Sequence, residues 1–152
     1  MKAAVIYYSR SGITKKIAEK VQARFGADLF FVEPVKDYGN FVSAIARVIA
    51  EKASKKTPAP KTAAADFSAY DTVFIGFPVW AASLPDFLRE YIRGIDLAGK
   101  RVIPFATAGN SGRESSLAAV KELLPDSRIT DYFYTSMKEK ADEDAWLDSI
   151  RE

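Results

Sequence analysis

Ala3-Ala4-Val5-Ile6-Tyr7-Tyr8-Ser9-Arg10-Ser11-Gly12-Ile13-Thr14 is the stretch on which the fold prediction rests. It begins as a short apolar run and ends in a turn that carries hydroxyl groups and one glycine. Ile17, Ala18, Val21 and Phe25 then recur at helical spacing, which predicts an amphipathic helix directly after the turn. Strand, tight turn and helix in this order place backbone N–H groups at a helix N-terminus, where the unsatisfied amides and the helix dipole favour an anion.

The composition is typical of a globular chain with one hydrophobic core. Of the 152 residues 48% are hydrophobic, and the formal net charge is +2. We expect a single domain over residues 1–152. The near-balanced charge argues against a nucleic-acid partner, and no apolar run approaches the roughly 18 residues that a membrane span requires. The first residues lack a signal-peptide pattern, so we expect a cytoplasmic protein.

The sequence contains neither cysteine nor histidine. Disulfides, zinc sites built on these residues, and cysteine or histidine catalysis are therefore excluded. We predict no metal site and no catalytic acid or base. Any redox chemistry would have to come from a bound organic cofactor.

Apolar runs and helical patterns alternate along the chain. We expect strands at residues 2–8, 29–32, 71–77, 101–107 and 129–134, and helices at 13–25, 41–54, 85–93, after Gly112 up to 124, and 142–150. Gly26 stands where a helix C-terminal glycine belongs. Pro104 interrupts the fourth strand, which we interpret as a bulge or local irregularity. Residues 55–61 are polar and are expected to form a surface loop.

This alternation predicts an α/β fold: a five-stranded parallel sheet in the order 2-1-3-4-5, with helices on both faces in a three-layer sandwich. Ligands of such sheets bind at the carboxyl ends of the strands, beside the switch point between strands 1 and 3. The candidate site therefore consists of a first loop (residues 9–14), a second loop (78–83) and a third loop (107–112), which follow the first, third and fourth strands.

Each loop has a feature that suits a ligand and a plainer explanation. Hydroxyls and amides of the first loop could surround a phosphate monoester, although a hydroxyl-capped turn explains them as well. The loop matches neither a Walker loop nor a G-x-G-x-x-G turn, so a pyrophosphate is not favoured. Trp80 could stack on a planar ring, or pack on a helix or in an interface. Gly109 and Gly112 would let backbone approach such a ring, or form a flexible turn.

With these three loops, the sequence resembles the flavodoxin family. Ser9-Arg10-Ser11-Gly12-Ile13-Thr14 is similar to the family's phosphate signature T/S-x-T-G-x-T. Residues 77–80, which read Phe-Pro-Val-Trp, are similar to the Y/F-P-I/V-W segment of the short bacterial subgroup. Residues 105–112 are similar to that subgroup's F-x-T-x-G-x-S-G. The resemblance spans about residues 2–150, and it implies the flavodoxin-like sandwich described above.

The resemblance also implies the cofactor FMN and assigns the residues that would bind it. The phosphate would be held by Ser9, Arg10, Ser11, Gly12, Ile13 and Thr14. The ring would be lined by Pro78, Val79, Trp80 and Ala81. The pyrimidine edge and ribityl chain would face Thr107, Ala108, Gly109, Asn110 and Gly112. The family's electron transfer requires no catalytic acid or base, because the flavin supplies the chemistry and the protein tunes it.

Two departures from the family pattern bear on function. Ala81 and Ala82 stand where many relatives have a glycine, and alanine is strained at positive φ. We therefore expect the backbone flip that flavodoxins make on reduction to be absent or to lie elsewhere. Flavodoxins are usually strongly acidic, whereas this chain is near neutral, which counts against charge-steered docking to a basic reductase.

Three functions are compatible with the sequence. The leading hypothesis is an FMN-binding electron carrier between two redox partner proteins, a reductase and an acceptor. The first alternative is an NAD(P)H-dependent reductase of quinones or similar acceptors, which would use an open face over the flavin. The second alternative is a flavin-free interaction module with the same fold.

Overall fold

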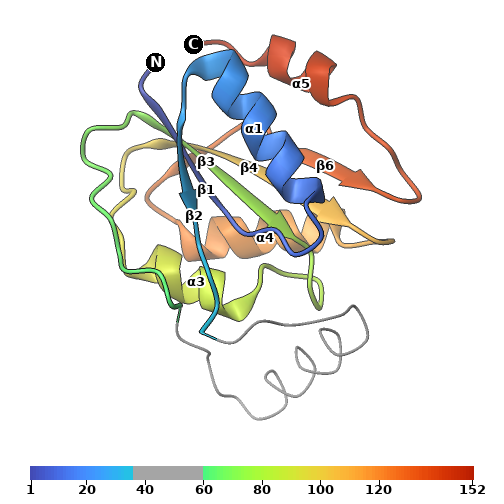
Figure 1. Ribbon diagram of the computed structural model, residues 1–152, viewed down its shortest axis with the longest axis horizontal. Helices are drawn as coiled ribbons and strands as arrows, with labels where there is room; N and C mark the ends of the chain where they lie inside the picture. Colours follow the sequence, from blue (N-terminus) through green and yellow to red (C-terminus); the bar gives the residue numbers. More distant parts are fainter. Residues whose placement is uncertain (36–59) are drawn as a thin grey trace.

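The computed structural model describes residues 1–35 and 60–152, which are organised around a parallel sheet (Figure 1). β1 (Ala3–Tyr7) lies between β2 (Asp28–Phe31) and β3 (Thr72–Pro78), and β4 (Arg101–Ala108) pairs with the far edge of β3. Two short strands, β5 (Arg128–Ile129) and β6 (Phe133–Ser136), both pair with β4. The predicted α/β fold and strand order are confirmed, with two strands sharing the fifth position.

The prediction of one continuous strand at 129–134 is wrong. Val102 pairs with Ile129, but Phe105 pairs with Phe133, so the chain holds one extra residue between β5 and β6. The chain accommodates the extra residue at Asp131, which has a φ of 52°. This value lies in the left-handed region, which Asp tolerates better than most side chains. The sheet therefore contains six strands in the part of the chain that the structure describes.

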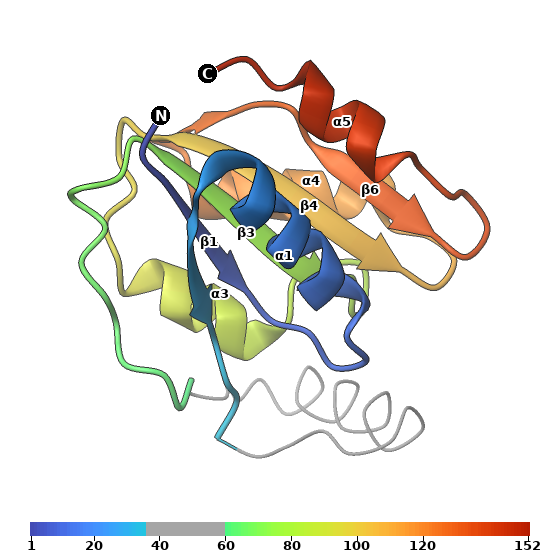
Figure 2. The same cartoon turned by 45° about the horizontal axis from the view of Figure 1, so that its top comes forward.

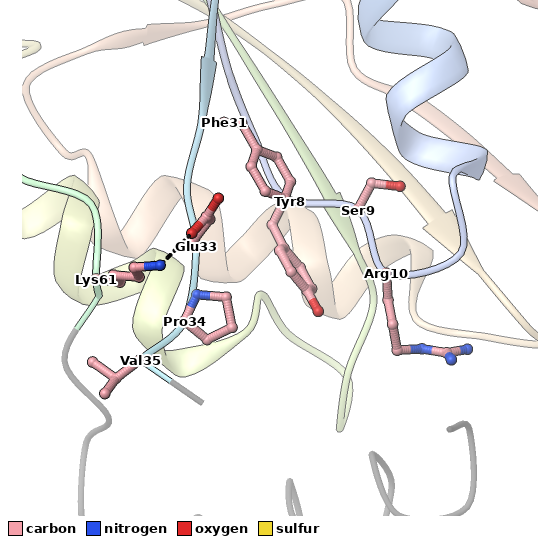
Figure 3. Close-up of a pocket in the computed structure, with 8 residues that line it drawn as sticks. All are labelled: Tyr8, Ser9, Arg10, Phe31, Glu33, Pro34, Val35 and Lys61. Carbon is pink, nitrogen blue, oxygen red and sulfur yellow. Dashed lines mark ion pairs between the residues drawn. The ribbon is translucent and has the colours of Figure 1, made fainter. Parts of the chain in front are cut away.

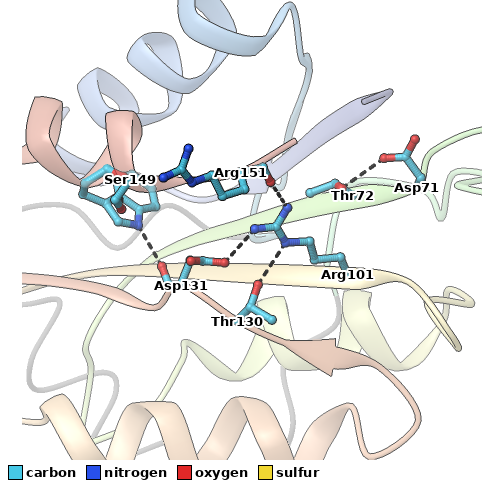
Figure 4. Close-up of polar contacts among 8 residues, drawn as sticks. Asp71, Thr72, Arg101, Thr130, Asp131, Ser149 and Arg151 are labelled. Atoms are coloured by element: carbon cyan, nitrogen blue, oxygen red, sulfur yellow. Dashed lines mark hydrogen bonds and ion pairs between the residues drawn. The ribbon is translucent and has the colours of Figure 1, made fainter.

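The break between β5 and β6 lies opposite Pro104. Thr130 N donates to Val102 O and Met137 N donates to Ala108 O, so even-numbered residues of β4 face the fifth position. Pro104 has no N–H to donate on that side. The irregularity that we predicted at this proline therefore lies in the neighbouring strand. The Arg101 side chain donates to Thr130 Oγ1 and pairs with Asp131, and so stabilises the break between the two strands (Figure 4).

Helices cover both faces of the sheet (Figures 1 and 2). α1 (Ile13–Phe25) and α5 (Glu143–Ser149) pack on one face, and α3 (Asp86–Arg93) and α4 (Arg113–Leu123) pack on the other. Strand residues alternate between the two faces, because successive side chains of a strand point to opposite sides. Phe74 thus packs toward α1, whereas Val73 and Ile75 pack toward α3. This burial on both sides explains why the strands read as continuous apolar runs.

The predicted helix boundaries agree with the structure to within a few residues. α1 has the predicted bounds, and Gly26 ends it in a left-handed conformation with φ 65°. Asp142 caps α5 by accepting from the backbone N–H groups of Asp144 and Ala145. The predicted helix at 41–54 and most of the loop at 55–61 lie outside the described residues. None of the described helices is long and apolar enough to cross a membrane.

Candidate functional site

The first loop connects β1 to α1 and leaves the start of that helix open. Gly12 precedes the helix with φ 93°, a conformation that suits glycine. Ser9 Oγ accepts a hydrogen bond from Gly12 N at 3.0 Å and so closes the turn. No side chain from the described part of the chain caps the N-terminus of α1. A 13-residue helix with an uncapped N-terminus and hydroxyls beside it has the chemistry of an anion site.

The residues of the first loop differ in their exposure. Ser11 and Ile13 are exposed, and Ile13 keeps 55% of its accessible surface although it is apolar. Ser9, Arg10 and Gly12 are half-buried. Thr14 is buried at 2% exposure, and its hydroxyl lies within hydrogen-bond distance of the Thr107 hydroxyl.

The second loop is a tight turn after β3. Trp80 N donates to Ser83 O at 2.9 Å and Ser83 N donates to Trp80 O at 3.1 Å, which leaves Ala81 and Ala82 as the two turn residues. Both alanines have positive φ, 49° and 63°. Positive φ at both central residues is the signature of a type I′ hairpin turn, which normally uses Asn and Gly. Both alanines thus adopt the strained conformation that we expected alanine to disfavour, and the absence of a backbone flip at this turn stays a prediction.

Trp80 is half-buried at the base of this turn. Its ring meets the edge of Tyr8, with centroids 5.5 Å apart and planes at 77°. Tyr8 is 3% exposed, and it also meets Phe87 of α3 edge-on at 4.8 Å. Tyr8 thus supports Trp80 from the end of β1. Tyr8 is not among the predicted site residues, although its position directly after β1 places it at the same edge of the sheet.

The third loop connects β4 to α4. Gly109 and Asn110 are exposed, and Gly112 precedes α4 with φ 114°. A Cβ at position 112 would lie 2.7 Å from Val79 Cγ1, so the second loop packs closely against this glycine. Gly112 is therefore required both by its backbone conformation and by its neighbour.

Direct contacts join the three loops. Thr14 Oγ1 and Thr107 Oγ1 are hydrogen-bonded at 2.8 Å, which links the first loop to the third. Val79 N donates to Thr107 O at 2.8 Å, which links the second loop to the third. Tyr8, the residue that directly precedes the first loop, contacts Trp80 of the second loop. The structure thus brings all three predicted loops together at the carboxyl edge of the sheet.

A cavity of about 450 Å³ adjoins the first loop on the side of β2 (Figure 3). It is lined by Tyr8, Ser9, Arg10, Phe31, Glu33, Pro34, Val35 and Lys61. Lys61 Nζ pairs with Glu33 Oε2 at 3.3 Å in its wall. Sequence reasoning selected only Ser9 and Arg10 from this set. None of the lining residues belongs to the second or third loop, so the cavity is not the space between those loops.

The residues that are present fit a phosphate ester of a planar ring. The first loop offers an uncapped helix start and hydroxyls, and among the described residues no cluster of acidic side chains suggests a metal instead. The second and third loops offer an aromatic ring and exposed backbone beside it. Burial and then the negative charge of Glu19 raise the pKa of Tyr7, the last residue of β1, above the ordinary value of a tyrosine.

Residues 2–150 match a family model described as flavodoxin. A solved structure of a candidate flavoprotein from Bacteroides uniformis is 27% identical, covers 99% of this chain and 98% of its own, and superposes with a TM-score of 0.83. A solved structure of a candidate flavoprotein from Bacteroides eggerthii is 33% identical, covers 98% of this chain and 97% of its own, and has a TM-score of 0.75.

A third solved structure is a flavoprotein from Lactobacillus acidophilus in complex with FMN. It is 20% identical, covers 95% of this chain and 97% of its own, and has a TM-score of 0.75. At this identity the likeness concerns the fold. No curated protein matches the sequence.

Proposed function

The chain belongs to the flavodoxin family, and from this premise we propose that it binds FMN at the three loops and carries electrons between redox partner proteins. The observation that carries the proposal is the convergence of the loops through the Thr14–Thr107, Val79–Thr107 and Tyr8–Trp80 contacts. The FMN complex of the Lactobacillus acidophilus relative supports the choice of flavin. FMN would supply the redox chemistry, and the protein would bind and orient it.

The roles of the residues follow from their positions. Backbone N–H groups at the start of α1 and the hydroxyls of Ser9, Ser11 and Thr14 would hold the phosphate. Ser9 already accepts from Gly12 N, so its own O–H can donate to the phosphate. Trp80 would stand beside the ring, supported from behind by Tyr8. Backbone of the third loop, from Ala108 to Gly112, would face the polar edge of the ring.

Titration of FMN with the purified apoprotein tests this proposal. We expect the flavin fluorescence to be quenched in a one-to-one complex. Unquenched fluorescence at micromolar protein would favour the flavin-free interaction module instead. Riboflavin serves as the matched ligand without phosphate, and a weaker complex with riboflavin would show that the phosphate contributes to binding.

A second candidate function is an NAD(P)H-dependent quinone reductase. The observation that favours it is the brevity of the second loop, because a two-residue turn leaves Ala81 and Ala82 exposed and does not extend over the site. The holoprotein mixed with NADH or NADPH and a quinone would distinguish the two. Rapid NAD(P)H oxidation without any added reductase would support the enzyme, whereas a carrier would require a partner protein.

A further inference from the structure

The hydrogen bond between Thr14 and Thr107 connects two loops that lie 93 residues apart in the sequence. Thr14 belongs to the first turn of α1, and Thr107 is the penultimate residue of β4. Both side chains are buried, at 2% and 8% exposure. A buried pair of hydroxyls is separated from competing water, so the groups around the pair decide which hydroxyl donates the hydrogen bond.

Each hydroxyl has one proton to donate and two lone pairs to accept with. Either threonine could be the donor in the pair at 2.8 Å. An anion at the start of α1 removes this ambiguity, because it accepts hydrogen bonds and cannot donate them. If Thr14 donates its proton to the anion, only Thr107 can donate in the pair.

We propose that Thr107 is a positioning residue for the phosphate, acting through Thr14. This inference rests on the proposed FMN function. Thr107 O–H donates to Thr14 Oγ1, which holds the Thr14 side chain in one rotamer and polarises its O–H toward the phosphate. The sequence resemblance had placed Thr107 at the ring edge and ribityl chain, so this assignment gives its side chain a different role.

The side chain and the backbone of Thr107 have different hydrogen-bond partners. Thr107 O accepts from Val79 N and holds the second loop beside the third. A change that removes only the hydroxyl therefore leaves this link between the ring-binding loops intact. The Thr107 hydroxyl would affect binding of the phosphate, whereas the Thr107 carbonyl holds together the two loops that would contact the ring. Comparing the affinities for FMN and for riboflavin, which lacks the phosphate, therefore distinguishes the two roles.

The test measures FMN and riboflavin affinities of Thr107→Val and Thr107→Ser by fluorescence titration. Valine has nearly the shape of threonine but no hydroxyl, and serine keeps the hydroxyl. The matched control is Thr72→Val, the same change at a buried threonine (3% exposed) at the opposite end of the neighbouring strand. We expect Thr107→Val to weaken FMN by about three- to tenfold and to leave riboflavin unchanged. Thr107→Ser and Thr72→Val should keep the wild-type affinities.

Several results would overturn the inference. Equal losses for FMN and riboflavin in Thr107→Val would place the hydroxyl at the ring, and unchanged or increased FMN affinity would show that Thr107 does not assist Thr14. If Thr107→Val does not fold, Thr107→Ala is measured in the same way. Failure of the wild-type protein to bind FMN would overturn the proposed function itself, which keeps the two outcomes distinguishable.

Discussion

The ring of Phe105 lies directly against Gly76, its partner in the β3–β4 pair. A Cβ at position 76 would lie 2.1 Å from Phe105 Cζ. Phe105 is fully buried, and its ring also packs near Trp146 with centroids 6.0 Å apart. The ring therefore has no open space into which it could move. Trp146 belongs to α5, so the contact between Gly76 and Phe105 lies on the face of the sheet that this helix covers.

We expect Gly76→Ala to lower the free energy of unfolding by about 1–3 kcal/mol, since the added methyl group overpacks the core. Urea denaturation measures the loss. Gly109→Ala is the matched control, because a Cβ there meets no described atom within 4 Å and its φ is not positive. Equal stability of the two variants would contradict the close packing of Phe105 on Gly76.

Ser11→Asp should abolish FMN binding. Ser11 is exposed in the first loop, so an aspartate fits there without disturbing the fold. Its charge would lie beside the phosphate, and the hydroxyl donor would be lost. We expect FMN affinity to fall at least about 100-fold, which corresponds to two charge-assisted interactions of roughly 1.5 kcal/mol each. Ser68→Asp, an exposed serine before β3, is the control, and equal FMN affinity of the two variants would remove the first loop from the site.

Trp80→Ala should weaken FMN by about tenfold or more, because stacking on an aromatic side chain contributes roughly 1–3 kcal/mol per ring. Trp80→Phe should retain most of the affinity. The chain has two tryptophans, so in Trp146→Phe the tryptophan emission comes from Trp80 alone. We expect FMN to quench that emission. Quenching without any loss of affinity in Trp80→Ala would show that Trp80 lies near the flavin but does not hold it.

The turn in the second loop should become more stable when its residues match its backbone. An L-residue in the left-handed region costs roughly 1–2 kcal/mol, and Asn-Gly is the preferred pair for two positive φ values. We expect Ala81→Asn combined with Ala82→Gly to raise the free energy of unfolding by about 1 kcal/mol. Ala118→Gly, an exposed position inside α4, should lower it by a similar amount. A loss of stability in the double variant would contradict the turn geometry.

The sequence predicted the parts of the fold that depend on local pattern. The apolar runs gave the strands, and helical spacing together with Gly26 gave the bounds of α1. The break at Asp131 could not be predicted, because residues 129–134 read as one continuous strand. The only local signals were an aspartate, which tolerates positive φ, and Pro104 in the neighbouring strand.

In the candidate site, too, the sequence pattern predicted some features, whereas others depend on tertiary neighbours. The strand order placed the three loops at one edge, and the structure brings them into contact. The Thr14–Thr107 bond was not predictable, because the direction of a hydroxyl depends on tertiary neighbours and not on spacing along the chain. Tyr8 was missed for a similar reason, since an aromatic residue at the end of β1 reads as one more core residue.

The last prediction concerns the network around Arg101 (Figure 4). Arg101 Nη2 pairs with Asp131 Oδ2 at 2.8 Å, and Arg101 also donates to Thr130 Oγ1 and to Arg151 O. Burial works to raise the pKa of Asp131, but hydrogen bonds from Thr130 and Arg101 and the charge of Arg101 outweigh it, and the pKa is lowered. The folded pKa is thus below the unfolded value of about 3.9.

A lowered carboxyl pKa contributes stability above the unfolded pKa, and that stability is lost as the pH falls through the folded value. Asp131→Asn keeps a side chain that tolerates the left-handed backbone but removes the charge. We expect it to cost about 1 kcal/mol at pH 7, and the difference from wild type to shrink toward pH 3 as Asp131 is protonated. Urea denaturation at pH 7, 5 and 3 measures this, with Asp126→Asn, an exposed residue outside the network, as control. A difference that does not change with pH would show that the charge of Asp131 does not stabilise the break between β5 and β6.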